Sequence, residues 1–217
     1  MNTKSLIAEF IGTFALIFIG AGAVAIDIGG LMGAALAHGF VVVAFIYAYG
    51  HISGTHINPA VTLALLIAGE IEFVAAIGYW IVQFLGGILG AVLLNALLPN
   101  PSDLGATILT EGVTPVQGLV VEIVLTFFLV NTIFTTAVNG KAGNFAGLAI
   151  GLTLIACILM GGPLTRASLN PARTLGPAIF STDPQWGNIW LYFIGPCVGA
   201  ILAALLHIGV FKNKGEA

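Results

Sequence analysis

The triplet Asn-Pro-Ala occurs twice in this chain, and each copy opens a short apolar stretch. Other residues recur together with it, at an offset of 112 or 113 positions. The repeated pairs are Asn58 and Asn170, Glu9 and Glu122, and the Tyr-x-Ile sequences at 79–81 and 192–194. This pattern predicts an internal duplication, with halves at about 1–100 and 113–217 inside a single domain that spans 1–217.

The composition indicates a membrane protein. Hydrophobic residues make up 59% of the chain and charged residues only 7%, with a mean hydropathy of +1.08. A soluble domain would carry roughly a quarter charged residues. The net charge of −3 is small and scattered, so the chain has no basic face for a nucleic acid. We therefore expect a lipid bilayer as its surroundings and no nucleic-acid partner.

Six apolar stretches are long enough to cross a bilayer, which requires about 20 apolar residues. They cover residues 5–26, 32–50, 71–95, 117–138, 144–162 and 187–210. Two shorter apolar runs, 58–69 and 170–180, begin at the Asn-Pro-Ala triplets. Irregular backbone at membrane depth is tolerated only where protein buries it or where it lines a water-filled cavity. The sequence thus predicts an all-α membrane protein with six transmembrane helices and two re-entrant half-helices.

The charged residues between the spans predict the orientation. Lysines occur at the N-terminus, between the fourth and fifth spans, and at the C-terminus, namely Lys4, Lys141, Lys212 and Lys214. The positive-inside rule makes these regions cytoplasmic. The other connections carry acidic residues and face outward, and the longest of them, Asn100 to Pro115, joins the halves. Three crossings per half give an inverted repeat, whose functional elements lie near the midplane.

The Asn-Pro pairs are expected to begin the two half-helices. Proline suits the first helical position, and asparagine is a strong cap just before it. If Asn58 and Asn170 accept from their own helices, their side-chain N–H groups point to the space between the halves. Both helix dipoles present positive ends there, which disfavours a cation and accepts a neutral hydrogen-bond acceptor. The pattern favours a channel over an enzyme.

Glu9 and Glu122 are carboxylates within predicted spans, where a charge costs at least a few kcal/mol. Their repetition suggests one role performed twice. We expect each to accept hydrogen bonds from backbone amides of the re-entrant loop in its own half. Proton or ion relay is the alternative.

The motifs themselves resemble those of the aquaporins, members of the major intrinsic protein family. The similarity is carried by AEFIGT at 8–13, HISGTHINPAVT at 51–62 and NPARTLGPA at 170–178, and it extends over essentially the whole chain. It implies a passive water channel that excludes protons and ions, with a homotetrameric assembly. In this family the residues before the first Asn-Pro-Ala, here His56, line the inner passage.

The resemblance also implies a narrow outer filter, which maps to His38, Ile158, Ala167 and Arg173. A cation in the first turn of a helix is unfavourable, so Arg173 is expected to supply a fixed charge and a fork of donors to the channel. Arg166 departs from the small residue usual at its position. It either reshapes the outer vestibule or pairs with His38 or an acidic loop residue.

The filter composition bears on the transported solute. Strict water channels of the family carry an aromatic residue where His38 stands and a histidine where Ile158 stands. The set found here instead resembles the tonoplast subgroup of plants, whose members pass water and often ammonia, urea or hydrogen peroxide. Glycerol is disfavoured, because Thr174 stands where glycerol facilitators carry an aspartate. A facilitator mainly for ammonia, urea or peroxide is the first alternative function.

Two further functional classes remain as alternatives. A coupled transporter would use Glu9 and Glu122 as coupling groups, and a structural junction protein would conduct little water. No nucleophile–base pair, metal-ligand spacing or cofactor motif is present, so neither an enzyme nor a bound metal or cofactor is expected. Cys157 and Cys197 lie in apolar stretches outside the filter, so mercurials should block weakly. We place the protein in the plasma membrane.

Small residues in the third span are expected to permit close helix packing. They are Gly86, Gly87, Gly90 and Ala91.

Overall fold

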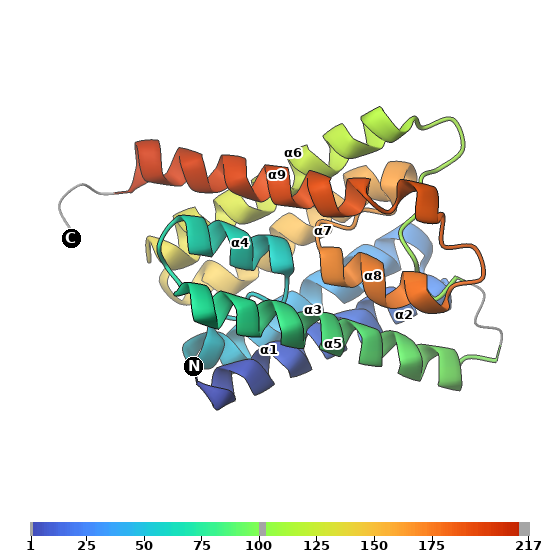
Figure 1. The fold of residues 1–217 in the computed structure, drawn as a ribbon, viewed down its shortest axis with the longest axis horizontal. Helices are drawn as coiled ribbons and strands as arrows, with labels where there is room; N and C mark the ends of the chain where they lie inside the picture. Colours follow the sequence, from blue (N-terminus) through green and yellow to red (C-terminus); the bar gives the residue numbers. More distant parts are fainter. Residues whose placement is uncertain (1, 100–102, 213–217) are drawn as a thin grey trace.

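The computed structural model describes residues 2–99 and 103–212, and every regular element within them is helical (Figure 1). Six helical segments are long and apolar enough to cross a membrane: Thr3–Ala25, Gly30–Ser53, Phe73–Leu97, Pro115–Val138, Gly143–Thr165 and Trp186–Phe211. Each end lies within three residues of the predicted span, so the predicted fold class is confirmed. Lys214 and residues 100–102 of the predicted connection lie outside the described residues.

Several of these spans combine more than one type of helix. The first joins α1 (Thr3–Ala15), a π-helical turn (Leu16–Ala21) and α2 (Gly22–Ala25). The second and third are α3 (Gly30–Ser53) and α5 (Phe73–Leu97). The remaining three contain α6 (Pro115–Ile133), α7 (Ala146–Thr165) and α9 (Leu191–Leu206), and π-helical turns follow α6 and α9.

The two re-entrant half-helices are α4 (Pro59–Ile67) and α8 (Pro171–Phe180). They enter from opposite ends of the molecule, and their N-termini meet near its middle (Figure 1). Proline occupies the first helical position of each, and the preceding asparagine is the N-cap, as the sequence predicts. Both half-helices pack against α5 and α9, so each is held by helices from both halves.

Glycines allow close contacts between helices, and equivalent glycines do so in each half of the molecule. A Cβ atom on Gly86 would lie 2.5 Å from the carbonyl oxygen of Phe10, and one on Gly199 would lie 2.2 Å from that of Ile123. These contacts bring α5 against α1 and α9 against α6, at equivalent places in the two halves. Gly87 likewise approaches the carbonyl oxygen of Ala172 on α8. The small residues of α5 therefore pack inside the protomer.

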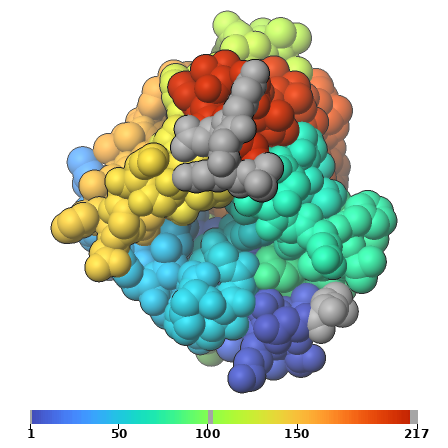
Figure 2. Space-filling model, turned by 90° about the vertical axis from the view of Figure 1, so that its left-hand side faces the viewer, coloured from blue at the N-terminus to red at the C-terminus, as the bar shows by residue number. Residues whose placement is uncertain are grey.

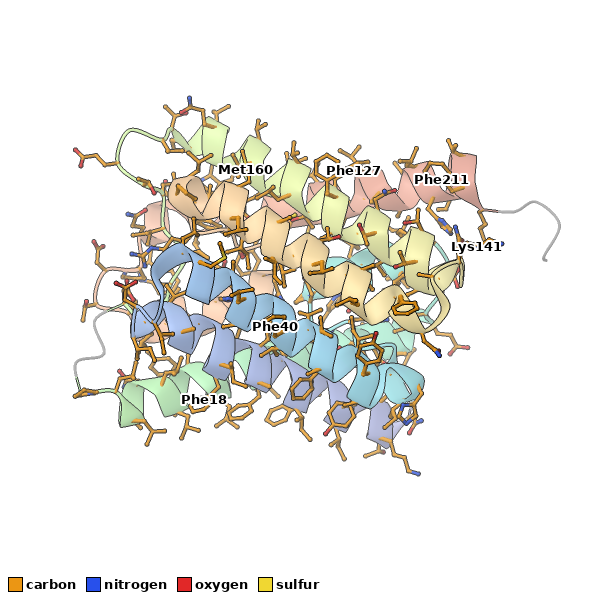
Figure 3. All side chains as sticks on the ribbon, turned by 180° about the vertical axis from the view of Figure 1, so that it is seen from behind. Phe18, Phe40, Phe127, Lys141, Met160 and Phe211 are labelled. Atoms are coloured by element: carbon orange, nitrogen blue, oxygen red, sulfur yellow. The ribbon has the colours of Figure 1, made fainter. Side chains whose placement is uncertain are left out.

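The molecule has one hollowed end and an apolar outer surface. Figure 2 looks onto the end where α1 begins and the last span ends, and a hollow lies between the light-blue, teal and yellow segments. The side chains that point outward along the spans are mostly apolar, and Phe40 and Met160 are each 55% exposed (Figure 3). Lys141 lies at the same end as Phe211 (Figure 3). This surface is suited to lipid, so the chain is a multi-pass integral membrane protein.

Candidate functional site: a channel between the two half-helices

The two capping asparagines join the halves at the centre. Asn58 Oδ1 accepts from the backbone N–H of Ala60, and Asn170 Oδ1 accepts from that of Ala172. Each side-chain amide also donates across to the opposite half, Asn58 to the carbonyl of Leu169 at 2.8 Å and Asn170 to that of Ile57 at 2.9 Å. The sequence did not reveal these crossed bonds. They use one N–H of each amide and leave the other for the space between the halves.

Glu9 holds the loop that leads into α4. Its Oε1 accepts from the backbone N–H of His56 at 2.9 Å and from Ser53 Oγ at 2.7 Å. Its Oε2 accepts from the N–H of Ile57 at 2.6 Å and from Gln83 Nε2 at 2.8 Å. The carboxylate is fully buried and accepts from both loop amides, while Gln83 Nε2 also donates to Thr62 Oγ1 at 2.9 Å.

Glu122 holds the loop that leads into α8 in the same way. It accepts from the backbone N–H of Ser168 at 2.9 Å and of Leu169 at 2.8 Å, and from Thr165 Oγ1 at 2.7 Å. The loop also needs support because several non-glycine residues in it have left-handed backbone, including Leu169 at φ 55°. Such residues cost about 1–2 kcal/mol each unless the surroundings impose them.

The repeated tyrosines are further supports that sequence reasoning noted but did not assign. Tyr79 donates its hydroxyl to the carbonyl of Ser53 at 2.8 Å, and Tyr192 donates to that of Thr165 at 3.0 Å. Both accepting residues lie at the start of a re-entrant loop. The repeat offset was therefore a usable signal for these two side chains, whereas Gln83 has no repeat-related partner because residue 196 is a proline.

Three cavities lie along the space between the halves. The central one, the lumen, has a volume of about 80 Å³ and is lined by residues that include His38, Val42, His56, Asn58, Leu154, Ile158, Asn170 and Arg173. An outer vestibule is lined by Asp27, Leu31, Asp103, Arg166 and Ala167 among others. An inner vestibule is lined by Gly50, Ser53, Glu70, Thr136 and Gly140 among others, near the hollow in Figure 2. A water needs roughly 10–15 Å³ on this measure, so the lumen has room for a short file of waters.

The predicted filter residues lie where the lumen meets the outer vestibule. His38, Ile158 and Arg173 line both cavities, and Ala167 lines the vestibule. His56 lines the lumen and the inner vestibule, and its Nδ1 lies 3.1 Å from Thr62 Oγ1. The structure thus brings the four filter residues to one boundary and places His56 towards the other.

His38 has a defined orientation in this boundary. Its Nδ1 lies 2.8 Å from the carbonyl oxygen of Ala34 and donates to it, so in the neutral ring Nε2 is an acceptor. This buried Nε2 has no hydrogen-bond partner within the described residues. The imidazole ring packs directly against Gly20, in the π-helical turn of the first span. A larger residue would not fit there, because a Cβ on Gly20 would lie 2.7 Å from His38 Cδ2. Sequence reasoning missed Gly20.

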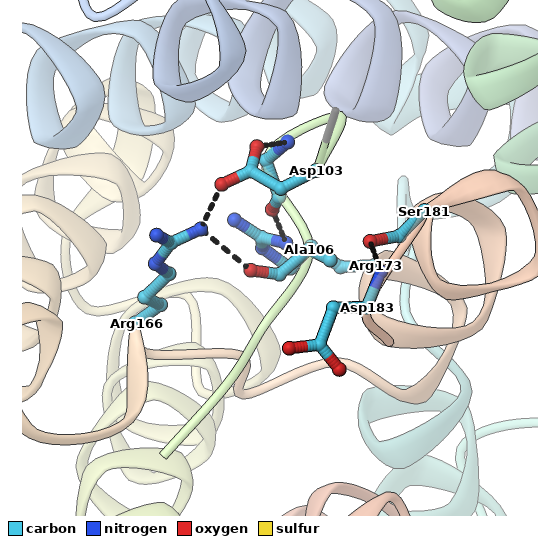
Figure 4. A network of polar contacts seen from close by, with 7 residues as sticks. Asp103, Ala106, Arg166, Arg173, Ser181 and Asp183 are labelled. Atoms are coloured by element: carbon cyan, nitrogen blue, oxygen red, sulfur yellow. Dashed lines mark hydrogen bonds and ion pairs between the residues drawn. The ribbon is translucent and has the colours of Figure 1, made fainter. Parts of the chain in front are cut away.

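Arg173 and Arg166 are both held by the connection that follows α5. Arg173 is 1% exposed, and its Nη1 donates to the carbonyl of Gly105 at 2.6 Å. Arg166 Nη1 donates to Asp103 Oδ2 at 2.6 Å and to the carbonyl of Ala106 at 3.2 Å (Figure 4). Among the pairings considered from the sequence, Arg166 therefore pairs with an acidic loop residue.

Neither cysteine lines a cavity of this passage. Cys157 is buried, with its Sγ 3.6 Å from the carbonyl oxygen of Leu125, and Cys197 is partly buried on α9. In the part of the chain that the structure describes, no group of three histidine, cysteine or acidic side chains could hold a metal ion.

Comparison with known proteins adds to this geometry. The family model described as "Major intrinsic protein" matches residues 1–207. The probable aquaporin TIP3-2 of Arabidopsis thaliana is 40% identical over 95% of this chain and 83% of its own, and the probable aquaporin TIP2-2 of Oryza sativa subsp. japonica is 40% identical over 100% of this chain and 90% of its own. The X-ray structure of the aquaglyceroporin from Plasmodium falciparum matches with a TM-score of 0.84 at 25% identity, over 96% of each chain.

Proposed function

Because the chain belongs to the major intrinsic protein family, we propose that it is a passive water channel that excludes protons and other ions. The observation that carries the proposal is the lumen between the two vestibules, with Asn58 and Asn170 among its lining residues. Water crosses it in a short file, within a single channel domain that spans 1–217. Conduction of this kind requires no covalent chemistry.

The chemistry of the lumen supports water as the solute. Each capping amide has one N–H left to donate to a water oxygen. Two half-helices present their N-terminal ends to the same place, so a cation there meets positive potential from both sides. Arg173 adds a fixed charge, and an arginine together with half-helix dipoles is a recognised barrier to protons and cations in pores of this type.

The buried carboxylates favour a passive channel over a coupled transporter. Glu9 and Glu122 are fully buried, and neither lines the lumen or a vestibule. Their oxygens accept hydrogen bonds from loop amides and nearby side chains. We infer that they support the loops, because a proton or sodium ion bound to them would displace those bonds.

Stopped-flow light scattering on proteoliposomes tests the proposal. We expect osmotic shrinkage much faster than that of protein-free liposomes, and the same rate with or without a proton or sodium gradient. Gradient-dependent solute flux would favour a coupled transporter instead. Shrinkage at the rate of protein-free liposomes would contradict a channel and favour a structural role.

Passage of ammonia, urea or hydrogen peroxide is a second candidate, and the filter geometry favours it. The unpartnered Nε2 of His38 can accept a hydrogen bond from such a solute, Ile158 offers an apolar wall, and Ala167 takes little space. A filter of this kind admits a small polar molecule that is wider than water.

The substitution His38→Phe tests the filter. Phenylalanine is larger and lacks the Nε2 acceptor, so urea uptake is expected to fall about tenfold, since pocket changes of this size alter discrimination by about 1–3 kcal/mol. Water permeability should fall less. The measurement is uptake of labelled urea beside osmotic shrinkage in the same liposomes. Phe40→Leu, a lipid-facing change on the same helix, is the control, and urea uptake unaffected by His38→Phe would refute this filter.

The orientation and assembly are proposed on other grounds. We propose cytoplasmic termini, because Lys4 lies near the N-terminus, Lys141 between the fourth and fifth spans, and Lys212 just after the last span. The positive-inside rule makes regions that carry lysine cytoplasmic. A homotetramer stays a prediction from the family resemblance. The prediction of the plasma membrane is not supported by the relatives, whose TIP names are those of tonoplast aquaporins. We therefore assign the chain only as a multi-pass integral membrane protein.

A further inference from the structure

Arg166 occupies a backbone position that favours glycine. It has φ 56° and follows α7, as Gly54 with φ 80° follows α3 at the equivalent place in the first half. A left-handed backbone costs free energy for a residue with a Cβ atom and little for glycine. The second half therefore carries an arginine where the first half uses the less strained residue, which suggests that the arginine side chain has a role of its own.

The side chain of Arg166 is linked to the filter arginine through four residues in sequence. Arg166 donates to Asp103 Oδ2 and to the carbonyl of Ala106. Asp103 Oδ1 accepts from the N–H of Gly105 at 2.8 Å, and the carbonyl of Gly105 accepts from Arg173 Nη1 (Figure 4). The segment 103–106 thus connects the two guanidinium groups, one in the vestibule and one at the filter.

The segment 103–106 is also confined from its other side. Gly105 has φ 69°, and a Cβ on it would lie 2.3 Å from the carbonyl oxygen of Ala21. Leu104 is fully buried. The segment is therefore pressed between the first span and the filter, and a small displacement of it moves the carbonyl that holds Arg173.

The ion pair itself is poorly placed to stabilise the fold. The side chains of Arg166 and Asp103 are 32% and 37% exposed. Exposed ion pairs contribute little to stability and are screened by salt. A contribution to geometry explains the strained arginine better than a contribution to stability.

We propose that Arg166 and Asp103 are positioning residues of the filter. They fix the segment 103–106 across the outer mouth, so that the Gly105 carbonyl holds the guanidinium of Arg173 at one place on the lumen wall. Without the pair, the guanidinium takes up a range of positions, and the filter discriminates differently between water and a wider solute such as urea. This inference rests on the proposed channel function and adds the residues that set its selectivity.

The experiment compares the ratio of urea to water permeability in proteoliposomes. Arg166→Gly removes the pair and relieves the backbone strain, and Asp103→Asn removes the charge but keeps an oxygen for the Gly105 N–H. Both are expected to change the ratio about threefold or more, as mutations along such a network do. The double variant should change it no further than either single variant, because the two residues act as one unit. Thermal stability should be retained, and for Arg166→Gly retained or raised.

Two variants serve as controls. Arg166→Lys keeps the charge in the same strained backbone and should restore most of the native ratio. Asp183→Asn removes an exposed outer carboxylate near the network and should leave the ratio unchanged (Figure 4). In the native protein, raised ionic strength at constant osmolarity should shift the ratio towards that of Arg166→Gly.

The outcomes separate this inference from the channel function. If the native protein conducts water and both Arg166→Gly and Asp103→Asn keep the native ratio, the inference is overturned and the channel stands. If Arg166→Gly does not fold, Asp103→Asn decides alone. If the native protein conducts no water, the proposed function fails, and the inference falls with it.

Discussion

The substitution Glu122→Leu is expected to abolish water conduction and to lower the thermal stability of the protein by a large amount. Two donors, the backbone N–H groups of Ser168 and Leu169, would lose their acceptor in a buried site, and the hydroxyl of Thr165 would keep only the more distant carbonyl of Gly161, at 3.4 Å. An unsatisfied buried donor costs about 1–3 kcal/mol. The sum is a large part of the roughly 5–15 kcal/mol that stabilises a typical domain.

The loss of conduction has a local cause as well. Ala167 and Leu169 have left-handed backbone, with φ 43° and 55°. Glu122 imposes that conformation on the loop, and the loop carries both the Leu169 carbonyl that accepts from Asn58 and the lead into α8. When the carboxylate is removed, the loop is free to relax, and the opposed asparagines no longer meet.

Thermal unfolding in detergent, followed by circular dichroism, and stopped-flow shrinkage of proteoliposomes measure the two effects. Val124→Leu on the same helix is the matched control, because Val124 is 42% exposed towards lipid. Glu122→Gln keeps one acceptor oxygen in the same shape and should lose less of both properties. A Glu122→Leu protein with native stability and native water permeability would show that the loop does not depend on this carboxylate.

Most of the fold could be predicted from sequence, for a physical reason. A bilayer requires each crossing segment to be apolar over about 20 residues, so composition alone marks the six spans. The Asn-Pro pairs mark the half-helices, because both residues have strong and specific preferences at a helix start. The repeat offset then identifies equivalent positions, such as Glu9 and Glu122, whose loop contacts are alike in the structure.

The details of the filter could not be predicted in this way. His38 is seated by Gly20 in a π-helical turn, and such a turn has no signal in the sequence. The sequence offers acidic residues in several of the outward-facing connections as partners for Arg166. Only the three-dimensional course of the segment after α5 brings Asp103 to it. The crossed bonds of Asn58 and Asn170 depend on two loops meeting in space. Contacts between segments far apart in the chain are set by tertiary structure, which local preferences do not encode.

A thiol introduced at the filter offers a direct test of whether water crosses the lumen. Ile158 lines both the lumen and the outer vestibule, and it lies within α7, where the preceding residue is already a cysteine. A mercurial bound to the sulfur of Ile158→Cys would fill a passage whose volume is only about 80 Å³. The native cysteines Cys157 and Cys197 line neither cavity, so the unmodified protein provides its own control.

The decisive measurement is the osmotic shrinkage rate of Ile158→Cys proteoliposomes before and after mercurial treatment. We expect rapid shrinkage before treatment, a fall almost to the rate of protein-free liposomes after it, and recovery with a reducing agent, while the native protein is blocked only weakly. Rapid shrinkage of the Ile158→Cys vesicles that persists after the thiol is fully modified would contradict water passage between Asn58 and Asn170.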